Sequence, residues 1–197
     1  MTEKSTEYAV SPEKLLRLSE AARRAAEGRV AAKSWSALCI YGSQVSGYAS
    51  ADSDLDALLV VENFEPSVKY LYIREEHPTV ALLVVDEEIF EADMRKASLG
   101  EFVSGRFLTP YYPVLGRDLI RSADFESKKR IATETLRNLS LERRIAATEM
   151  LIRPEYFLFD KMRRRASLYP PVRYSYAKIL RQPQGSRNLP IMVERFV

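Results

Sequence analysis

Three short runs of aliphatic residues constrain the fold of this chain most strongly. They span 35–41, 55–62 and 79–86, and glycine, proline or small polar residues lie beside each of them. Runs of this length and composition are typical of buried strands. A fourth run, 68–76, alternates polar and apolar residues and is rich in tyrosine, so it predicts a strand that forms a hairpin with 79–86 or lies next to it.

Helical periodicity surrounds these strands. Ser11 and Pro12 form a helix start, because serine caps a helix and proline suits its first turn. Helices are expected over 12–33, 87–104, 125–139, 140–152 and 155–168, with a last helix or strand over 172–182. The sequence thus predicts an α+β protein with a small mixed sheet flanked by helices. Its expected domains are an α/β unit, 1–120, and a mostly helical basic region, 121–197.

Composition excludes several functional classes. The 197 residues include one cysteine, Cys39, and one histidine, His77. An intramolecular disulfide is therefore impossible, and a Cys/His zinc site is not expected. No apolar run approaches the roughly 20 residues that span a bilayer, and the first residues do not resemble a secretory signal. We expect a cytoplasmic protein without a membrane partner.

Charge is unevenly distributed along the chain. Residues 1–100 contain 11 Lys/Arg and 17 Asp/Glu, whereas residues 101–197 contain 19 Lys/Arg and 10 Asp/Glu. Arginines and tyrosines are interleaved over 161–181, which is a composition that can grip phosphates and stack on bases. The expected partner of this half is RNA or another phosphate-bearing acceptor. The alternative is a solvated helix face whose tyrosines pack against the α/β unit.

Two aspartates, Asp54 and Asp56, stand at the start of the second apolar run. Residues two apart on a strand point to the same face, so both carboxylates face one side while Leu55 is buried on the other. Like charges this close repel each other, and a divalent cation would remove that penalty. Oxygen ligands without histidine or cysteine suit Mg²⁺ or Mn²⁺.

The pair Gly42-Ser43 follows the first apolar run. A turn at this place offers backbone N–H groups and a hydroxyl to a phosphate, and glycine lets the phosphate approach without a Cβ in the way. Ten residues separate Ser43 from Asp54. That length allows the second strand to return beside the first. The phosphate-binding turn and the metal-binding aspartates would then face one cleft.

Together these motifs resemble those of the DNA polymerase β-type nucleotidyltransferase superfamily, including the kanamycin nucleotidyltransferase type. The resemblance covers roughly residues 12–95. It implies the nucleotidyltransferase fold, with Asp54 and Asp56 as catalytic ligands of two metal ions. It also implies that Gly42 and Ser43 hold the β- and γ-phosphates of a nucleoside triphosphate. A third carboxylate on a later strand would help to deprotonate the acceptor hydroxyl.

The third carboxylate is ambiguous in this sequence. The strand 79–86 has Thr79 or Ala81 where an acid is expected. Asp86 ends that strand and is the candidate for the third catalytic acid, but it would also serve as the cap of a helix that begins at the next residue. Glu75 and Glu76 are weaker candidates. A third acid more than about 8 Å from both aspartates lies beyond the reach of a shared metal ion.

The leading interpretation is a Mg²⁺-dependent nucleotidyltransferase. It would move a nucleoside monophosphate from a nucleoside triphosphate to a hydroxyl of an unidentified acceptor and release pyrophosphate. One alternative is a non-catalytic nucleotide- or RNA-binding module. Another is a partner protein of the toxin–antitoxin type, in which the helical half is the interaction surface.

Overall fold

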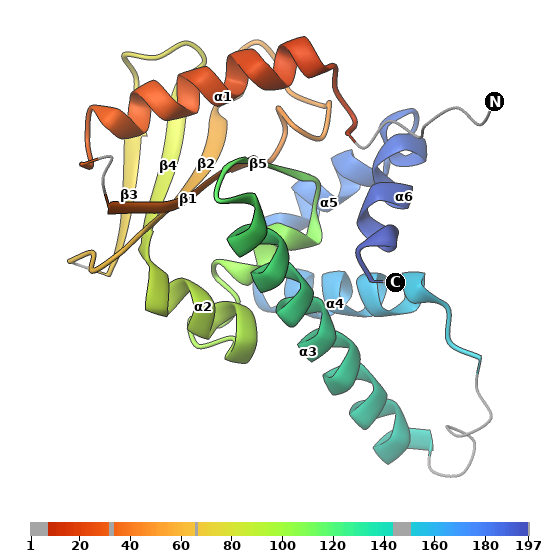
Figure 1. Cartoon of the computed structure of the whole chain (residues 1–197). Helices are drawn as coiled ribbons and strands as arrows, with labels where there is room; N and C mark the ends of the chain where they lie inside the picture. The colour runs from red at the N-terminus through yellow and green to blue at the C-terminus, as the bar shows by residue number, and fades with distance from the viewer. Residues whose placement is uncertain (1–7, 32–33, 66, 144–150, 197) are drawn as a thin grey trace, which may run out of the picture.

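The computed structural model describes residues 8–31, 34–65, 67–143 and 151–196. Over these ranges the chain forms an α+β fold with a C-terminal helical part, as the sequence predicts (Figure 1). The strands are β1 (Trp35–Tyr41), β2 (Leu55–Val61), β3 (Val68–Ile73), β4 (Val80–Asp86) and β5 (Tyr111–Leu115). The helices are α1 (Pro12–Glu27), α2 (Glu87–Lys96), the 3₁₀ helix η2 (Ser104–Leu108), α3 (Arg117–Arg143), α4 (Pro154–Leu168), α5 (Val172–Leu180) and α6 (Gln184–Glu194).

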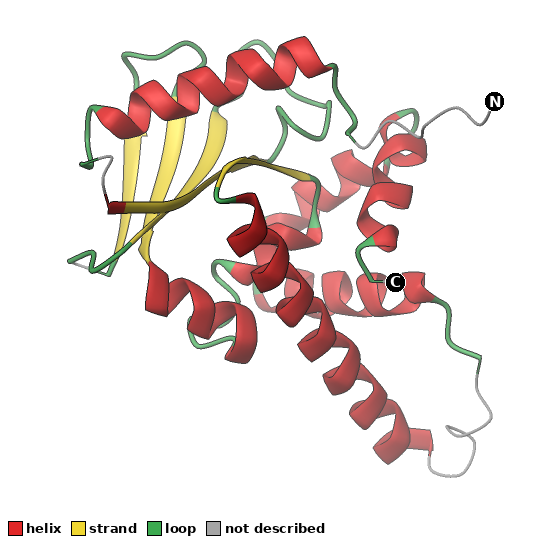
Figure 2. Cartoon of the chain, viewed as in Figure 1, coloured by secondary structure: helices red, strands yellow, loops and turns green. Residues whose placement is uncertain are grey.

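The five strands form one mixed sheet in the order β3-β4-β2-β1-β5. β2 and β4 pair in parallel, and the other neighbours are antiparallel. Helices lie on both faces of this sheet (Figure 2). Because β2 and β4 are interior strands and nearly all their residues are buried, each consists of a continuous aliphatic run rather than an alternating one.

Each face of the sheet has its own apolar core. On one face, α1 packs through residues such as Leu15, Leu18 and Ala22, and Figure 1 shows this helix lying across the strands. On the other face, Phe90 of α2 and Ile120 of α3 pack against the sheet and are fully buried. The first turns of α3 thus belong to the α/β unit, and the expected boundary after residue 120 falls inside this helix.

The buried carboxylate of Asp93 explains why α2 ends well before residue 104. It accepts hydrogen bonds from the backbone N–H groups of four residues in the loop that follows: Leu99, Glu101, Val103 and Ser104, at 2.8–3.2 Å. Bonds of this kind satisfy loop amides that a continuing helix would have used within itself. The same loop leads into η2, so Asp93 sets the position of the residues that η2 presents.

The C-terminal helices form a third core and contact the α/β unit. Leu158, Ile179 and Met192 bring α4, α5 and α6 together. The helix over 184–194 is not among those expected from the sequence, where the signals are weak, and Pro190 lies within it. The expected helices at 125–139 and 140–152 also differ from the structure. α3 is continuous from Arg117 to Arg143, and most of the second expected helix lies outside the described residues.

No helix within the described ranges has the length and apolar character needed to cross a membrane.

Replacing Asp93 by asparagine tests the role of this carboxylate in the fold. The amide nitrogen would face backbone N–H groups and leave several buried donors unpaired, so the free energy of unfolding should fall by about 2–4 kcal/mol. Chemical denaturation measures the change. The exposed Asp118→Asn variant is the matched control and should change stability by less than about 1 kcal/mol. Equal stability of Asp93→Asn and the wild type would show that these bonds do not organise the loop.

Candidate functional site

The end of β1 and the start of β2 meet at one point of the sheet. Tyr41 pairs with Asp56 across the antiparallel ladder, and Gly42 follows with a φ of +77°. A Cβ on Gly42 would overlap the Oδ2 atom of Asp56. Position 42 therefore requires glycine for two reasons. L-residues avoid this φ, and the carboxylate of Asp56 fills the space that a side chain would need.

The two aspartates share one side of the sheet, as the sequence predicts. Leu55 packs under α1. Asp56, the next residue, faces the opposite side of the sheet, where Leu58 packs. Asp54 lies just before β2 and accepts a hydrogen bond from the hydroxyl of Tyr72. Burial, and secondarily the charge of Asp54, raise the pKa of Asp56 to about 6, although Arg106 acts in the opposite direction. The site thus holds Asp56 in an environment that disfavours its negative charge.

The position beside Asp56 on β4 is neutral. In the parallel ladder Asp56 pairs with Ala81, which is 2% exposed. Adjacent strands lie about 5 Å apart, and paired residues face the same side. A third carboxylate next to the aspartates would therefore stand at position 81, where this chain has a methyl group.

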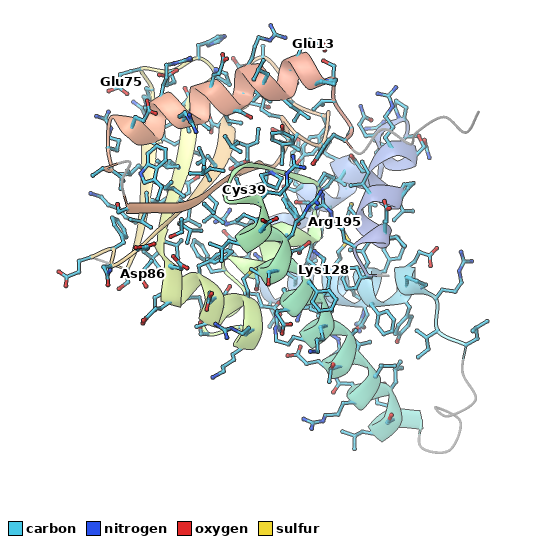
Figure 3. The ribbon with its side chains drawn as sticks, viewed as in Figure 1. Glu13, Cys39, Glu75, Asp86, Lys128 and Arg195 are labelled. Atoms are coloured by element: carbon cyan, nitrogen blue, oxygen red, sulfur yellow. The ribbon has the colours of Figure 1, made fainter. Side chains whose placement is uncertain are left out.

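The prediction that Asp86 completes the acidic site is wrong. Asp86 pairs with Val61 at the other end of β2, five residues along the strand from the Asp56–Ala81 pair, which corresponds to about 17 Å. Its carboxylate caps α2 by accepting the N–H of Glu88 at 3.0 Å, and it also accepts the N–H of Phe64 at 2.9 Å. Figure 3 labels Asp86 where β4 runs into α2. Its role is structural.

The weaker candidates are also placed elsewhere. Glu75 forms an ion pair with Arg29 at 3.2 Å, and Glu76 forms one with Arg24 of α1 at 3.1 Å. Both acids thus join the β3–β4 turn to the helix on the other side of the sheet. Among the described residues, no group of three or more Asp, Glu, His or Cys side chains is placed to hold a metal ion together.

Asp56 lines a cavity of about 210 Å³ between the sheet and the C-terminal helices. Two arginines share this cavity with it. Arg106 of η2 lies between the rings of Tyr41 and Phe102, with its Cζ 5.2 and 4.9 Å from their centroids. Arg165 of α4 donates to the carbonyl of Glu101 at 2.6 Å. The Nε atoms of both arginines are buried and have no hydrogen-bond partner within the described structure.

The remaining cavity walls are drawn from distant parts of the chain. They comprise Tyr41, Gly42, Tyr48, Phe102, Gly105, Thr109, Tyr169, Val172, Ser175, Tyr176 and Ile179. Gly105 leaves room for Arg165 in the cavity, since a Cβ at this position would overlap the guanidinium of Arg165. Carboxylate, guanidinium, hydroxyl and aromatic groups thus converge in one small space, which is typical of a binding site for a polar ligand.

The turn after Gly42 is held in place by the C-terminal half. Ser46 N–H bonds to Gly42 O at 3.0 Å, and Tyr48 N–H bonds to Ser43 O at 3.1 Å. From α6, the buried Asn188 donates to the carbonyl of Ser46 at 3.0 Å. The half-buried Ser43 is therefore held beside the acidic pair by contacts from a helix more than 140 residues away in sequence.

The basic segment 161–181 is largely engaged within the protein. Arg163 and Arg164 both pair with Asp160, at 3.0 and 2.6 Å. Lys161 pairs with Glu101, and Arg173 donates to the carbonyl of Ala166 at 3.0 Å. Of the three consecutive arginines, Arg163 and Arg164 thus share Asp160, whereas Arg165 contacts the carbonyl of Glu101. These contacts engage much of the positive charge, whereas Tyr169 and Tyr174 are exposed rather than packed against the α/β unit, so the expected RNA surface and its alternative both stay predictions.

Arg106, Arg165 and Asn188 are the site residues that sequence reasoning missed. Their types are common, and each reaches the site through tertiary packing. Only the alternation of arginine with aromatic residues in 161–181 gave a signal, and it pointed to the segment rather than to Arg165.

The raised pKa of Asp56 predicts how stability depends on pH in the metal-free protein. Its folded value of about 6 exceeds the ordinary 3.8, so the folded state binds more protons between these values and stability falls as pH rises through the window. Asp56→Asn removes this effect. In chelator, the variant should be more stable than the wild type above pH 6 by about 1–2 kcal/mol, after discounting for partial exposure, and equally stable below about pH 4.

Urea denaturation at a series of pH values measures this difference. The exposed Asp52→Asn variant should follow the wild-type curve throughout. Parallel curves for the wild type and Asp56→Asn over the whole range would rule out the raised pKa.

Comparison with known proteins leaves the family open. No family model matches the chain, and no curated protein has a significantly similar sequence. What the protein does is therefore inferred from the arrangement of its own residues.

Proposed function

We propose that this protein binds a nucleoside triphosphate together with Mg²⁺ or Mn²⁺ at the junction of β1, β2 and η2. The observation that carries the proposal is that Asp56, which lies close enough to Asp54 for their charges to interact, shares one cavity with Gly42 and with two arginines that have unpaired Nε atoms. A lone acidic pair would attract a cation only. Acids and unpaired guanidinium groups around one cavity suit a ligand with both a cation and phosphates.

The donor set fits a hard divalent cation. Asp54 and Asp56 offer carboxylate oxygens without histidine or cysteine, and the remaining coordination positions of such an ion are commonly filled by phosphate oxygens and water. When bound, the cation would neutralise the acidic pair and screen the charge of the phosphates. The raised pKa of Asp56 means that ionising this group costs free energy in the empty site, and a nearby cation offsets that cost.

The chain's own groups would hold the phosphates. Ser43 would supply a hydroxyl, and the turn that begins at Gly42, which the Ser46 N–H closes by bonding to Gly42 O, would bring its backbone to the phosphates. Arg106 and Arg165 would each gain a partner for a buried N–H group, which is worth more than a surface contact because an unpaired buried donor is costly. Tyr48 and Tyr176 supply further hydroxyls at the cavity wall.

Binding is favoured over nucleotidyl transfer by the residue beside Asp56. Transfer to a hydroxyl needs a base that accepts the hydroxyl's proton, and general bases act within hydrogen-bond reach of it. Ala81 stands where such a carboxylate would face the pair, and Asp86 lies about 17 Å away. We therefore place the non-catalytic binding module ahead of the transferase, which remains the competing proposal.

Titration with a fluorescent ATP analogue tests the binding site. In Mg²⁺, Asp56→Asn and Gly42→Ala should each weaken binding tenfold or more, since one removes a ligand of the cation and the other displaces that carboxylate. That factor corresponds to about 1.4 kcal/mol. Asp52→Asn, an exposed change on the same loop, should bind as the wild type does. Chelator should abolish binding, and undiminished affinity in Asp56→Asn would remove the proposed site.

Restoring an acid at position 81 tests why transfer is disfavoured. With water as the acceptor of the nucleoside monophosphate, Ala81→Asp should hydrolyse nucleoside triphosphates to monophosphate and pyrophosphate in Mg²⁺ faster than the wild type, because it supplies the third carboxylate beside Asp56. Ala81→Asn has the same size without the charge and should stay at the wild-type rate. Rapid pyrophosphate release by the wild type, lost in Asp56→Asn, would instead establish the transferase and overturn the binding-only proposal.

A further inference from the structure

Four aromatic rings surround the acidic pair and remain open to solvent. Tyr70, Tyr72, Phe102 and Tyr169 are 52%, 49%, 43% and 55% exposed. Phe102 and Tyr169 line the cavity that contains Asp56. Tyr70 is close enough to Asp56 and Tyr169 for their charges to affect its pKa, which burial raises first and these charges raise further. We refer to these four residues as the aromatic rim.

Strand register places two of these rings beside the site. Tyr72 pairs with Ala81 on β4, and Ala81 pairs with Asp56 on β2, so the three residues face the same side of the sheet. Tyr70 is two residues earlier on the same face. β3 is an edge strand, and nothing in the described chain covers these rings fully. Large exposed apolar groups that gather around a polar site commonly mark an interaction surface.

Guanidinium groups accompany the rings. Arg74 lies over Tyr72, with its Cζ 5.6 Å from the ring centroid. Arg106 lies 4.9 Å from the centroid of Phe102, and its buried Nε has no hydrogen-bond partner within the described structure. Rings for stacking and cations for phosphates, alternating along one edge, are the two elements with which proteins hold single-stranded nucleic acid.

The basic segment 161–181 does not offer the same combination. Most of its cations are paired with Asp160, Glu101 or backbone carbonyls. The rim, in contrast, combines exposed rings with the exposed guanidinium of Arg74. If the protein binds nucleic acid, the rim is therefore the better surface for it.

We propose that a single-stranded nucleic acid lies across the aromatic rim, with bases stacked on Tyr70, Tyr72 and Phe102 and phosphates near the exposed Arg74. A duplex would not serve, because its base faces are already stacked. This inference rests on the proposed function, since the neighbouring aspartates repel phosphates unless a divalent cation neutralises them. The strand thus occupies the edge of the same site that holds the Mg²⁺–nucleotide.

Fluorescence anisotropy with a labelled oligouridylate and the full chain, in Mg²⁺, tests the proposal. The double variant Tyr70→Ala/Tyr72→Ala should bind the RNA at least about tenfold more weakly, as expected for lost stacking. Tyr70→Phe keeps its ring and leaves the hydrogen bond between Tyr72 and Asp54 intact, so it should stay within about twofold of the wild type. Tyr156→Ala/Phe159→Ala removes two exposed rings of α4 that do not belong to the aromatic rim. This variant should bind the RNA as tightly as the wild type does. Thermal melts would verify that each variant is folded.

Two results would overturn the proposal. One is equal RNA affinity in the wild type and in Tyr70→Ala/Tyr72→Ala. The other is equally tight binding of duplex RNA or heparin, which would indicate simple charge attraction. Titrating the wild type with the fluorescent ATP analogue separates the two proposals. If the nucleotide binds but the ring changes leave RNA affinity unchanged, only the rim proposal is rejected. If the nucleotide does not bind, the function on which the rim proposal depends is rejected.

Discussion

The close approach of the Asp56 carboxylate to the backbone of Gly42 is the contact on which the rest of the site depends. It requires that β1 end in a residue without a side chain and with a positive φ, and that β2 begin directly beside that end. In return, a partly desolvated carboxylate lies directly against the turn that begins at Gly42. The negative charge of Asp56 is disfavoured there. The ionised residue therefore raises the free energy of the folded state, and a bound cation would remove this destabilisation.

The C-terminal helices contribute residues to this arrangement. Asn188 of α6 bonds to the turn after Gly42, and Arg165 of α4 reaches over Gly105 into the cavity. An ionic cluster formed by Glu101, Arg130 and Lys161 joins the loop before η2 to α3 and α4. Because Asp93 fixes the same loop, the position of Arg106 depends on contacts from several helices at once. Changes in the helical half are therefore expected to affect the acidic site.

Sequence alone predicted the strands and the acidic pair, because both depend on local pattern. Short aliphatic runs mark buried strands, and residues two apart on a strand share a face, so Asp54 and Asp56 could be placed together. The role of Asp86 could not be decided in this way. An acid at the end of a strand and the start of a helix satisfies two local patterns, and only the register of β2 against β4 shows that it lies at the far end. The same register identifies Ala81 as the neutral neighbour of Asp56. Arg106 and Asn188 reach the site by tertiary packing, which no local pattern reveals.

A crystal structure with Mn²⁺ and a non-hydrolysable nucleoside triphosphate tests the central claim most directly, because the anomalous signal locates the ion independently of the ligand. The account predicts a Mn²⁺ peak about 2.1 Å from carboxylate oxygens of Asp54 and Asp56, with the phosphates against the Gly42–Ser46 turn and near Arg106. Mn²⁺ and nucleotide bound elsewhere, with Asp54 and Asp56 free of both, would contradict it.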